Sequence, residues 1–213
     1  MQQITLKVGI ALCLVVVAST SASGAFPAFN ITAIASRGGC SILQCWQLAS
    51  PPVEARSAIN FAIGESTRAT WSIIEPRIEV GEAWALTPQL TIVLNGLVRI
   101  TAPFADSGSC QHPNNSSGTC IQGHSGVQRQ NTTVDCSCPE STTAYFMPGT
   151  LRSSLLLAAD TRALSYIRGH ETAFPSSEDT VLVQTPFLDG VVPEHRVLHE
   201  GPCVRGSGAR TWE

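Results

Sequence analysis

The sequence predicts an all-β fold, a barrel or a sandwich, with one domain. Eight or more short apolar segments follow one another, and Gly- and Pro-containing turn signals separate them. Hardly any stretch repeats apolar residues at helical spacing. Evenly spaced short strands of this kind are typical of barrels and sandwiches. A chain of 213 residues can bury one sizeable core.

Residues 1–22 predict a secretory signal peptide, and residues 23–213 a single mature domain. Lys7 precedes an apolar run over residues 8–18, and small residues follow over 19–25. This order is that of a cleaved signal. The run is shorter than the ~20 residues that a membrane span needs, and no later stretch could span a bilayer. We therefore expect a secreted protein that is not inserted in a membrane.

The mature chain predicts an extended arm over residues 26–36 and then a series of strands. The alternation of apolar residues supports strands in the middle of the chain, with one buried face. Asn95-Gly96 supplies the positive backbone angles of a two-residue hairpin, so strands 90–94 and 97–101 are expected to pair. The other predicted strands cover residues 58–63, 69–74, 164–167 and 180–187.

Residues 106–143 predict one long, cysteine-rich insertion between strands. This stretch is rich in Ser, Asn, Gly, Thr and Gln, and it has almost no aliphatic runs. Loops of this length are uncommon and are often functional, although the entropy of closing a loop grows slowly with its length. The insertion is therefore either a working surface or a tolerated addition.

Seven cysteines remain after the signal peptide has removed Cys13. Secretion predicts that most of them form disulfides, and the odd count leaves one thiol or one intermolecular bridge. A zinc site is disfavoured because a single residue separates Cys136 from Cys138, less than the usual gap between ligands. The disulfide candidates are Cys40, Cys45, Cys110, Cys120, Cys136, Cys138 and Cys203.

Four asparagines occur in Asn-x-Ser/Thr tripeptides and are candidate glycosylation sites. They are Asn30, Asn114, Asn115 and Asn131. A glycan at such a site requires a eukaryotic secretory pathway and an exposed chain. Three of the four fall within residues 106–143, which indicates that this stretch is exposed.

Charge excludes several classes of function. Lys7 is the only lysine, so the mature chain has none, and the net charge is −3. Schiff-base chemistry and a phosphate-loop lysine are thereby excluded. The arginines are scattered and form no basic patch, so we expect no nucleic-acid partner.

Two blocks resemble the conserved motifs of cupins, which are double-stranded β-helix barrels. QLTIVLNGLVRITAP resembles their first block, and MPGTLRSSLLLAADTRALSYIRGHET resembles the second, where Gly-His follows Pro-Gly. Residues 171–203 resemble the C-terminal part of small secreted cupin-like proteins of filamentous fungi. The resemblance implies a cupin-type barrel that carries the insertion, and a homodimer is one assembly that it allows.

The resemblance also implies a metal site, from which this chain departs. Metal-dependent cupins supply His-x-His and a glutamate from the first block and a third histidine from the second. Here Gln89 stands at the glutamate position, and residues 82–85 contain no histidine. Only His170 matches. One imidazole and one neutral amide cannot hold a divalent ion tightly, and Glu82 is the one carboxylate that could compensate. We expect no metal and no cofactor.

His170 and Gln89 are the candidate catalytic residues. His170 could act as a general acid or base, because the unperturbed pKa of histidine lies near neutrality. Its alternative is a barrel histidine hydrogen-bonded to backbone. Gln89 could orient a carbonyl or hydroxyl group of a ligand, and its alternative is a solvated strand amide.

Arg99 and Trp84 are the candidate ligand-binding residues. Arg99 lies on the opposite alternation from Ile100 and could pair with an acidic ligand, or it is a solvated strand arginine. Trp71 and Trp84 could wall a pocket or simply belong to the core. His195 and His199 are four residues apart, a spacing that would let them share a metal on a helix, but nearby prolines favour an exposed turn.

Three functions stay open from the sequence. The first is a pocket for a small organic molecule in which His170 moves protons, as in a metal-independent isomerase, cyclase or tailoring enzyme of secondary metabolism. The second is a non-catalytic secreted binding or effector-like protein that uses the disulfide-rich insertion. The third is a metal-dependent cupin oxidoreductase. Fold alone cannot decide among them.

Overall fold

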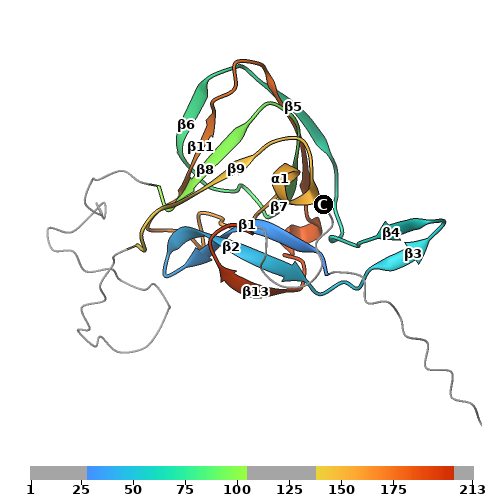
Figure 1. The fold of residues 1–213 in the computed structure, drawn as a ribbon. Helices are drawn as coiled ribbons and strands as arrows, with labels where there is room; N and C mark the ends of the chain where they lie inside the picture. The colour runs from blue at the N-terminus through green and yellow to red at the C-terminus, as the bar shows by residue number, and fades with distance from the viewer. Residues whose placement is uncertain (1–27, 105–137, 204–213) are drawn as a thin grey trace, which may run out of the picture.

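The computed structural model describes residues 28–104 and 138–203, and these residues form an all-β fold (Figure 1). Helix is confined there to α1 (Leu151–Ser154) and the short 3₁₀ turn η1 (Leu188–Gly190). The prediction of an all-β fold is confirmed. The predicted signal peptide and most of the predicted insertion, residues 106–137, lie outside the described ranges.

The larger sheet has seven strands in the order β13-β2-β1-β10-β7-β12-β5. All neighbours are antiparallel except β1 and β10, which are parallel. The strands are β1 (Asn30–Arg37), β2 (Cys40–Leu48), β5 (Thr70–Ile74), β7 (Gln89–Asn95), β10 (Leu155–Ala158), β12 (Thr180–Pro186) and β13 (His195–Glu200).

The smaller sheet has four antiparallel strands in the order β6-β11-β8-β9. They are β6 (Ile78–Ala83), β8 (Val98–Ala102), β9 (Thr142–Phe146) and β11 (His170–Phe174). Between β5 and β12 the chain changes sheet at nearly every connection, so the two sheets grow together. A separate ribbon of β3 (Val53–Ala55) and β4 (Ala58–Asn60) projects from the body (Figure 1).

The predicted hairpin is wrong, although its two strands are present. β7 pairs with β10 and β12, whereas β8 pairs with β9 and β11. The Asn95-Gly96 turn therefore carries the chain from one sheet to the other. Gly96 has a φ of +78°, and a Cβ there would lie 2.4 Å from Oγ1 of Thr180, so this corner requires glycine.

Two other sequence expectations are also corrected. The expected arm contains β1, which is an inner strand of the larger sheet, because β2 and β10 bind its two edges. Residues 164–167 form turns instead of a strand. The segment of His195 and His199 is strand β13, which β2 pairs along one edge, and not a helix or an exposed turn.

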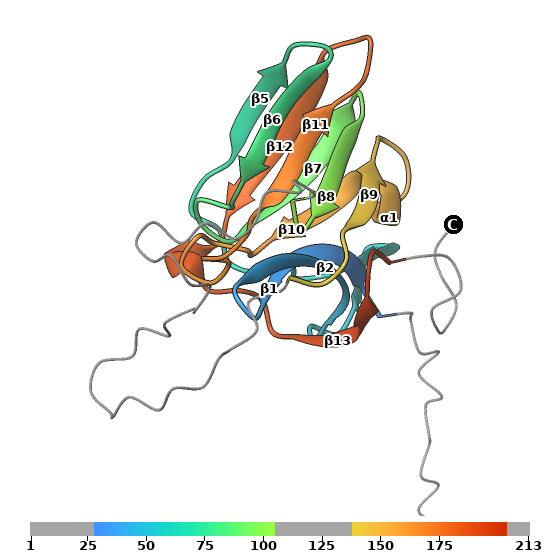
Figure 2. The ribbon, with the colours of Figure 1, turned by 90° about the vertical axis from the view of Figure 1, so that its left-hand side faces the viewer.

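The core has two parts, one on each face of the larger sheet. The first lies between the sheets and joins Val93, Leu156 and Leu182 to Ile100 and Phe146 of the smaller sheet. The second lies on the outer face of β1, β2 and β10 and includes Trp46, Leu157 and Phe187. Figure 2 shows β1, β2 and β13 at the base of the upright strands. Both faces of β1, β2 and β10 are thus buried.

Two disulfides fasten the base of the molecule. Cys40 pairs with Cys138, and Cys45 pairs with Cys203. Four of the seven disulfide candidates are therefore confirmed, whereas Cys110, Cys120 and Cys136 lie outside the described residues, as do Asn114, Asn115 and Asn131. Asn30 is half-buried at the start of β1, where its Oδ1 accepts a hydrogen bond of 3.2 Å from Nε2 of Gln47.

Candidate functional site

A polar cluster closes the basal end of the core between the two sheets. Residues directly opposite in a ladder share a face, so Thr172 lies on the face of Ile100, and His170 lies on the same face two residues earlier. The same alternation continues the inner face of β10 to Asp160 and that of β2 to Ser41. The polar cluster consists of Ser36, Ser41, Asp160, Ser165 and His170.

His170 is held by a carboxylate inside this polar cluster. Its Nδ1 lies 2.5 Å from Oδ2 of Asp160, and the hydroxyl of Ser41 donates to the same oxygen over 2.6 Å. The side chain of Asp160 is 0% exposed and that of His170 is 8% exposed. An ionised carboxylate can only accept, so Nδ1 of His170 carries the proton. Nε2 of His170 has no hydrogen-bond partner among the described residues.

Asp160 has one oxygen to spare. Oδ1 of Asp160 is buried and has no hydrogen-bond partner within the described part of the chain. A buried polar atom without a partner is costly and is rare in folded proteins. The site therefore has two polar positions that point to a further group, Oδ1 of Asp160 and Nε2 of His170.

The segment before His170 is fixed by several contacts. The N–H of Gly169 donates to Oε1 of Glu82 over 2.9 Å, and Nε1 of Trp84 donates to the carbonyl of Ser165 over 2.8 Å. Arg162 lies 4.2 Å from the centre of the Trp84 ring. A Cβ on Gly169 would lie 2.3 Å from the carbonyl oxygen of Ala83. Trp84 thus packs on the segment that orients His170, and Gly169 is required there by close backbone contact.

Gln89 comes from the facing sheet at the same end of the core. It lies opposite Ala158 in the ladder, so it shares the inner face that leads to Asp160 two residues later. Gln89 is half-buried, and Thr91, next on the same face, is buried. Ser72 and Gln184 continue this polar inner lining, with a hydrogen bond of 3.3 Å between them. The structure therefore brings Gln89 and His170 to one end of the core, without a direct contact between them in the described ranges.

Arg99 lies on the other side of the smaller sheet. It alternates with Val98 and Ile100 of the core, and its guanidinium lies 2.6 Å from Oε1 of Glu171 and 3.5 Å from Oε1 of Glu79. The hydrogen bond with Glu171 raises the pKa of Arg99, and the charges of Glu171 and Glu79 act in the same direction. Arg99 is therefore an outer-face ion pair and is separated from His170 by the sheet.

The residues at the expected metal positions do not fit a divalent ion. Glu82 lies beside Glu171 on the outer face and accepts from Gly169, while Ala83 stands opposite His170. Gln89 supplies only a neutral amide oxygen. Within residues 28–104 and 138–203, no three His, Cys, Asp or Glu side chains are grouped to hold a metal. His195 stacks on Trp46 with ring centres 3.6 Å apart, and a register shift separates it from His199.

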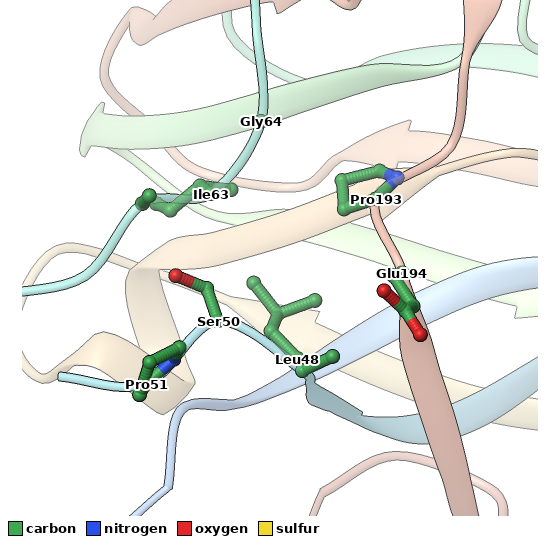
Figure 3. Close-up of a pocket in the computed structure, with 9 residues that line it drawn as sticks. Leu48, Ser50, Pro51, Ile63, Gly64, Pro193 and Glu194 are labelled. Carbon is green, nitrogen blue, oxygen red and sulfur yellow. The ribbon is translucent and has the colours of Figure 1, made fainter.

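A second hollow lies on the outer face of the base (Figure 3). It encloses about 390 Å³ between the end of β2 and the segments near Ile63 and Pro193. Leu48, Ile63 and Pro193 give it an apolar wall, and Glu194 and Ser50 are its polar side chains. It holds none of the four candidate catalytic and ligand-binding residues of the sequence.

Sequence reasoning missed Asp160 and Ser41. Asp160 was expected only as a turn residue, and Ser41 was hidden in the apolar segment 40–48. The one available signal was that Asp160 directly follows the buried run LLLAA, where an unpaired carboxylate would be unexpected.

Comparisons with family models, with curated proteins and with solved structures found no match for this chain. The cupin resemblance therefore rests on the motifs and on the strand arrangement. In the part of the chain that the structure describes, no helix has both the length and the apolar composition to cross a membrane.

Proposed function

We propose that strands β5 to β12 form a double-stranded β-helix of the cupin type. Two four-stranded runs support this proposal, β10-β7-β12-β5 in one sheet and β6-β11-β8-β9 in the other. Side chains from both runs meet in one core. Eight antiparallel strands shared between two facing sheets in this way are typical of jelly rolls, and cupins are among them. β13, β2 and β1 then extend one edge of that unit.

The chemical proposal is a metal-independent enzyme that transfers a proton within a small organic molecule. The observation that carries it is the hydrogen bond between fully buried Asp160 and Nδ1 of His170. A carboxylate on Nδ1 fixes the tautomer and ring orientation, and it stabilises the imidazolium that forms when the other nitrogen takes a proton. Nε2 of His170 is then the basic atom of the site.

A balanced reaction needs no oxidant and no cofactor. Nε2 of His170 removes a proton from a carbon next to a carbonyl, and the electron pair of that C–H bond moves into an enolate. The amide N–H of Gln89 stabilises the enolate oxygen. The imidazolium then returns the proton to another atom of the same molecule, which gives an isomer. Glu82 and Arg99 have no part in this reaction.

Deuterium uptake tests this proposal without knowledge of the physiological substrate. A panel of ketones, β-keto acids and lactones with acidic α-hydrogens is incubated with the protein in D₂O, and exchange is followed by NMR. We expect exchange for at least one compound class, with a loss of about 100-fold or more in His170→Gln. His195→Gln is the matched control, because His195 stacks on Trp46 and does not face the polar cluster.

The outcome that contradicts the enzyme proposal is equally clear. If no compound exchanges, or if His170→Gln and the wild type exchange equally, His170 is a structural residue of the base. A binding or effector-like protein that uses residues 106–137 then becomes the better description. Asp160→Asn adds an internal check, because it should slow exchange while leaving the imidazole in place.

The proposal also places the protein outside the cell. The two disulfides support an oxidising compartment, in which such bonds persist. N-terminal sequencing of protein from culture medium should begin at Ser23. Treatment with an endoglycosidase should lower the mass if any of the four candidate asparagines carries a glycan. A mature chain that begins at Met1 would contradict secretion by a cleaved signal.

A further inference from the structure

We propose that two copies of this chain pair through strand β5, edge to edge and antiparallel. This inference is independent of the proposed function. It starts from an apolar patch on the outer face of the larger sheet, the β5 patch. In the ladder, Trp71 lies opposite Val183 and Ile73 opposite Val181, and Ile92 follows on β7. These five residues form the β5 patch.

The β5 patch is largely uncovered at its edge. Trp71 is 62% exposed and Ile73 is 65% exposed, whereas Ile92 already packs against the second part of the core. The patch therefore continues a buried face out to solvent. Trp71 and Ile73 alone expose on the order of 300 Å², which is comparable to the largest apolar patch of an ordinary monomer.

The two edges of the larger sheet differ in their protection. β13 forms one edge and carries Arg196 and Glu200, and Glu200 pairs with Arg37. β5 forms the other edge, and its sequence TWSII has no charge and no proline. Charged side chains and prolines are the usual means by which sheet edges avoid pairing. The β5 edge lacks both, which makes it suited to accept another strand.

The sequence of β5 is complementary to itself. A twofold axis at Ser72 places Trp71 of each copy opposite Ile73 of the other, so both exposed side chains find an apolar partner. Arg68 and Glu75 are exposed at the two ends of β5. Antiparallel pairing brings the Arg68 end of one copy to the Glu75 end of the other, whereas parallel pairing would bring like charges together. Charge therefore favours the antiparallel arrangement.

The contact is large enough for a specific dimer. The two copies bury roughly 600 Å² of Trp71 and Ile73, and the paired main chains and flanking side chains bring the total to the roughly 1,000 Å² that such interfaces need. Main-chain hydrogen bonds along the joined edge add to this, as in other complexes formed by strand addition. The result is one continuous sheet across two copies.

Sedimentation equilibrium and light scattering of the secreted protein test the proposal. We expect a dimer at about 10 μM, and a rise of about 100-fold or more in the dimer Kd for Ile73→Lys, because the twofold axis places both substitutions in the interface. Val197→Lys is the matched control, since Val197 is 46% exposed on the opposite edge strand. A wild-type monomer at about 100 μM would overturn the proposal, as would a dimer that Ile73→Lys leaves intact.

Cysteine cross-linking tests the position of the axis. In the proposed register Ser72 meets Ser72 of the second copy at a Cα separation of about 4.5–5.5 Å, within the range of a disulfide. We expect Ser72→Cys to yield a covalent dimer on a non-reducing gel and Thr70→Cys to yield none. Equal cross-linking of Thr70→Cys and Ser72→Cys would indicate chance collisions and overturn the register.

Discussion

Oδ2 of Asp160 lies 2.5 Å from Nδ1 of His170, and the two residues come from opposite sheets although only ten residues separate them. The chain leaves β10, passes through residues 159–169 and returns in β11. This short path places a fully buried carboxylate on a nearly buried imidazole. The hydroxyl of Ser41 on β2 completes the link, so three segments of the chain depend on one carboxylate oxygen.

Asp160→Asn should destabilise the fold. The substitution removes the charge that Ser41 and His170 share, and the new amide N–H₂ would have to be buried in the place of an oxygen. We expect a loss of about 2–4 kcal/mol in the free energy of unfolding, measured with urea. Ser41→Ala should cost only about 1 kcal/mol, because one hydrogen bond is lost and no charge is left unpaired. Equal effects of the two substitutions would show that Asp160 has no special weight.

The sequence predicted strands better than it predicted their partners. The segments around Leu94 and Ile100 were recognisable because their apolar residues alternate, and β7 and β8 lie there. Asn95-Gly96 suggested a local hairpin, but the same backbone angles also suit a corner between two sheets. That choice depends on the long-range ladders of β7 with β10 and β12, which no local pattern contains.

The candidate site was only partly predictable for the same reason. His170 was found through the Gly-His motif, and the contact of Gly169 with Ala83 now gives that glycine a physical basis. Asp160 could not be assigned to His170, because the pairing of β10 and β11 with different sheets decides where the intervening loop lies. Arg99 was assigned to the correct alternation, opposite to Ile100, and the salt bridge with Glu171 identifies that face as the outer one.

Gly169→Ala should destabilise the base and disturb His170. A Cβ at this position would lie 2.3 Å from a backbone oxygen and 2.7 Å from the Trp84 ring, and the backbone of β6 cannot move away freely. We expect a loss of about 2 kcal/mol or more in unfolding free energy, in the range of overpacking substitutions. Gly38→Ala is a useful control, since nothing lies within 4 Å of its Cβ and only its φ of +59° opposes the change. A neutral Gly169→Ala would contradict the close packing described for this segment.

Arg99→Gln should have little effect on stability and none on deuterium exchange. The side chain of Arg99 is 31% exposed, and ion pairs of this kind contribute about 0–1 kcal/mol. The guanidinium lies on the far side of the sheet from His170, so it cannot contact a molecule bound there. Urea unfolding and the D₂O assay together check this expectation. A large loss of exchange in folded Arg99→Gln protein would place the reactive site on the outer face of the smaller sheet instead.

Removal of the Cys45–Cys203 bridge should release β13 before the rest of the fold. This edge strand pairs with β2 alone, and besides the disulfide its main side-chain anchor is the stack of His195 on Trp46. The bridge joins residues 158 apart, so the double variant Cys45→Ser/Cys203→Ser should lose about 2–5 kcal/mol of stability. Hydrogen exchange by mass spectrometry should show faster exchange in β13 than in β11. The matched variant Cys40→Ser/Cys138→Ser should instead affect the start of β2, because Cys40 pairs there with Arg168 beside Gly169 and His170. Unchanged protection of β13 in the first variant would mean that its ladder with β2 is sufficient, and that the bridge acts only on the unfolded chain.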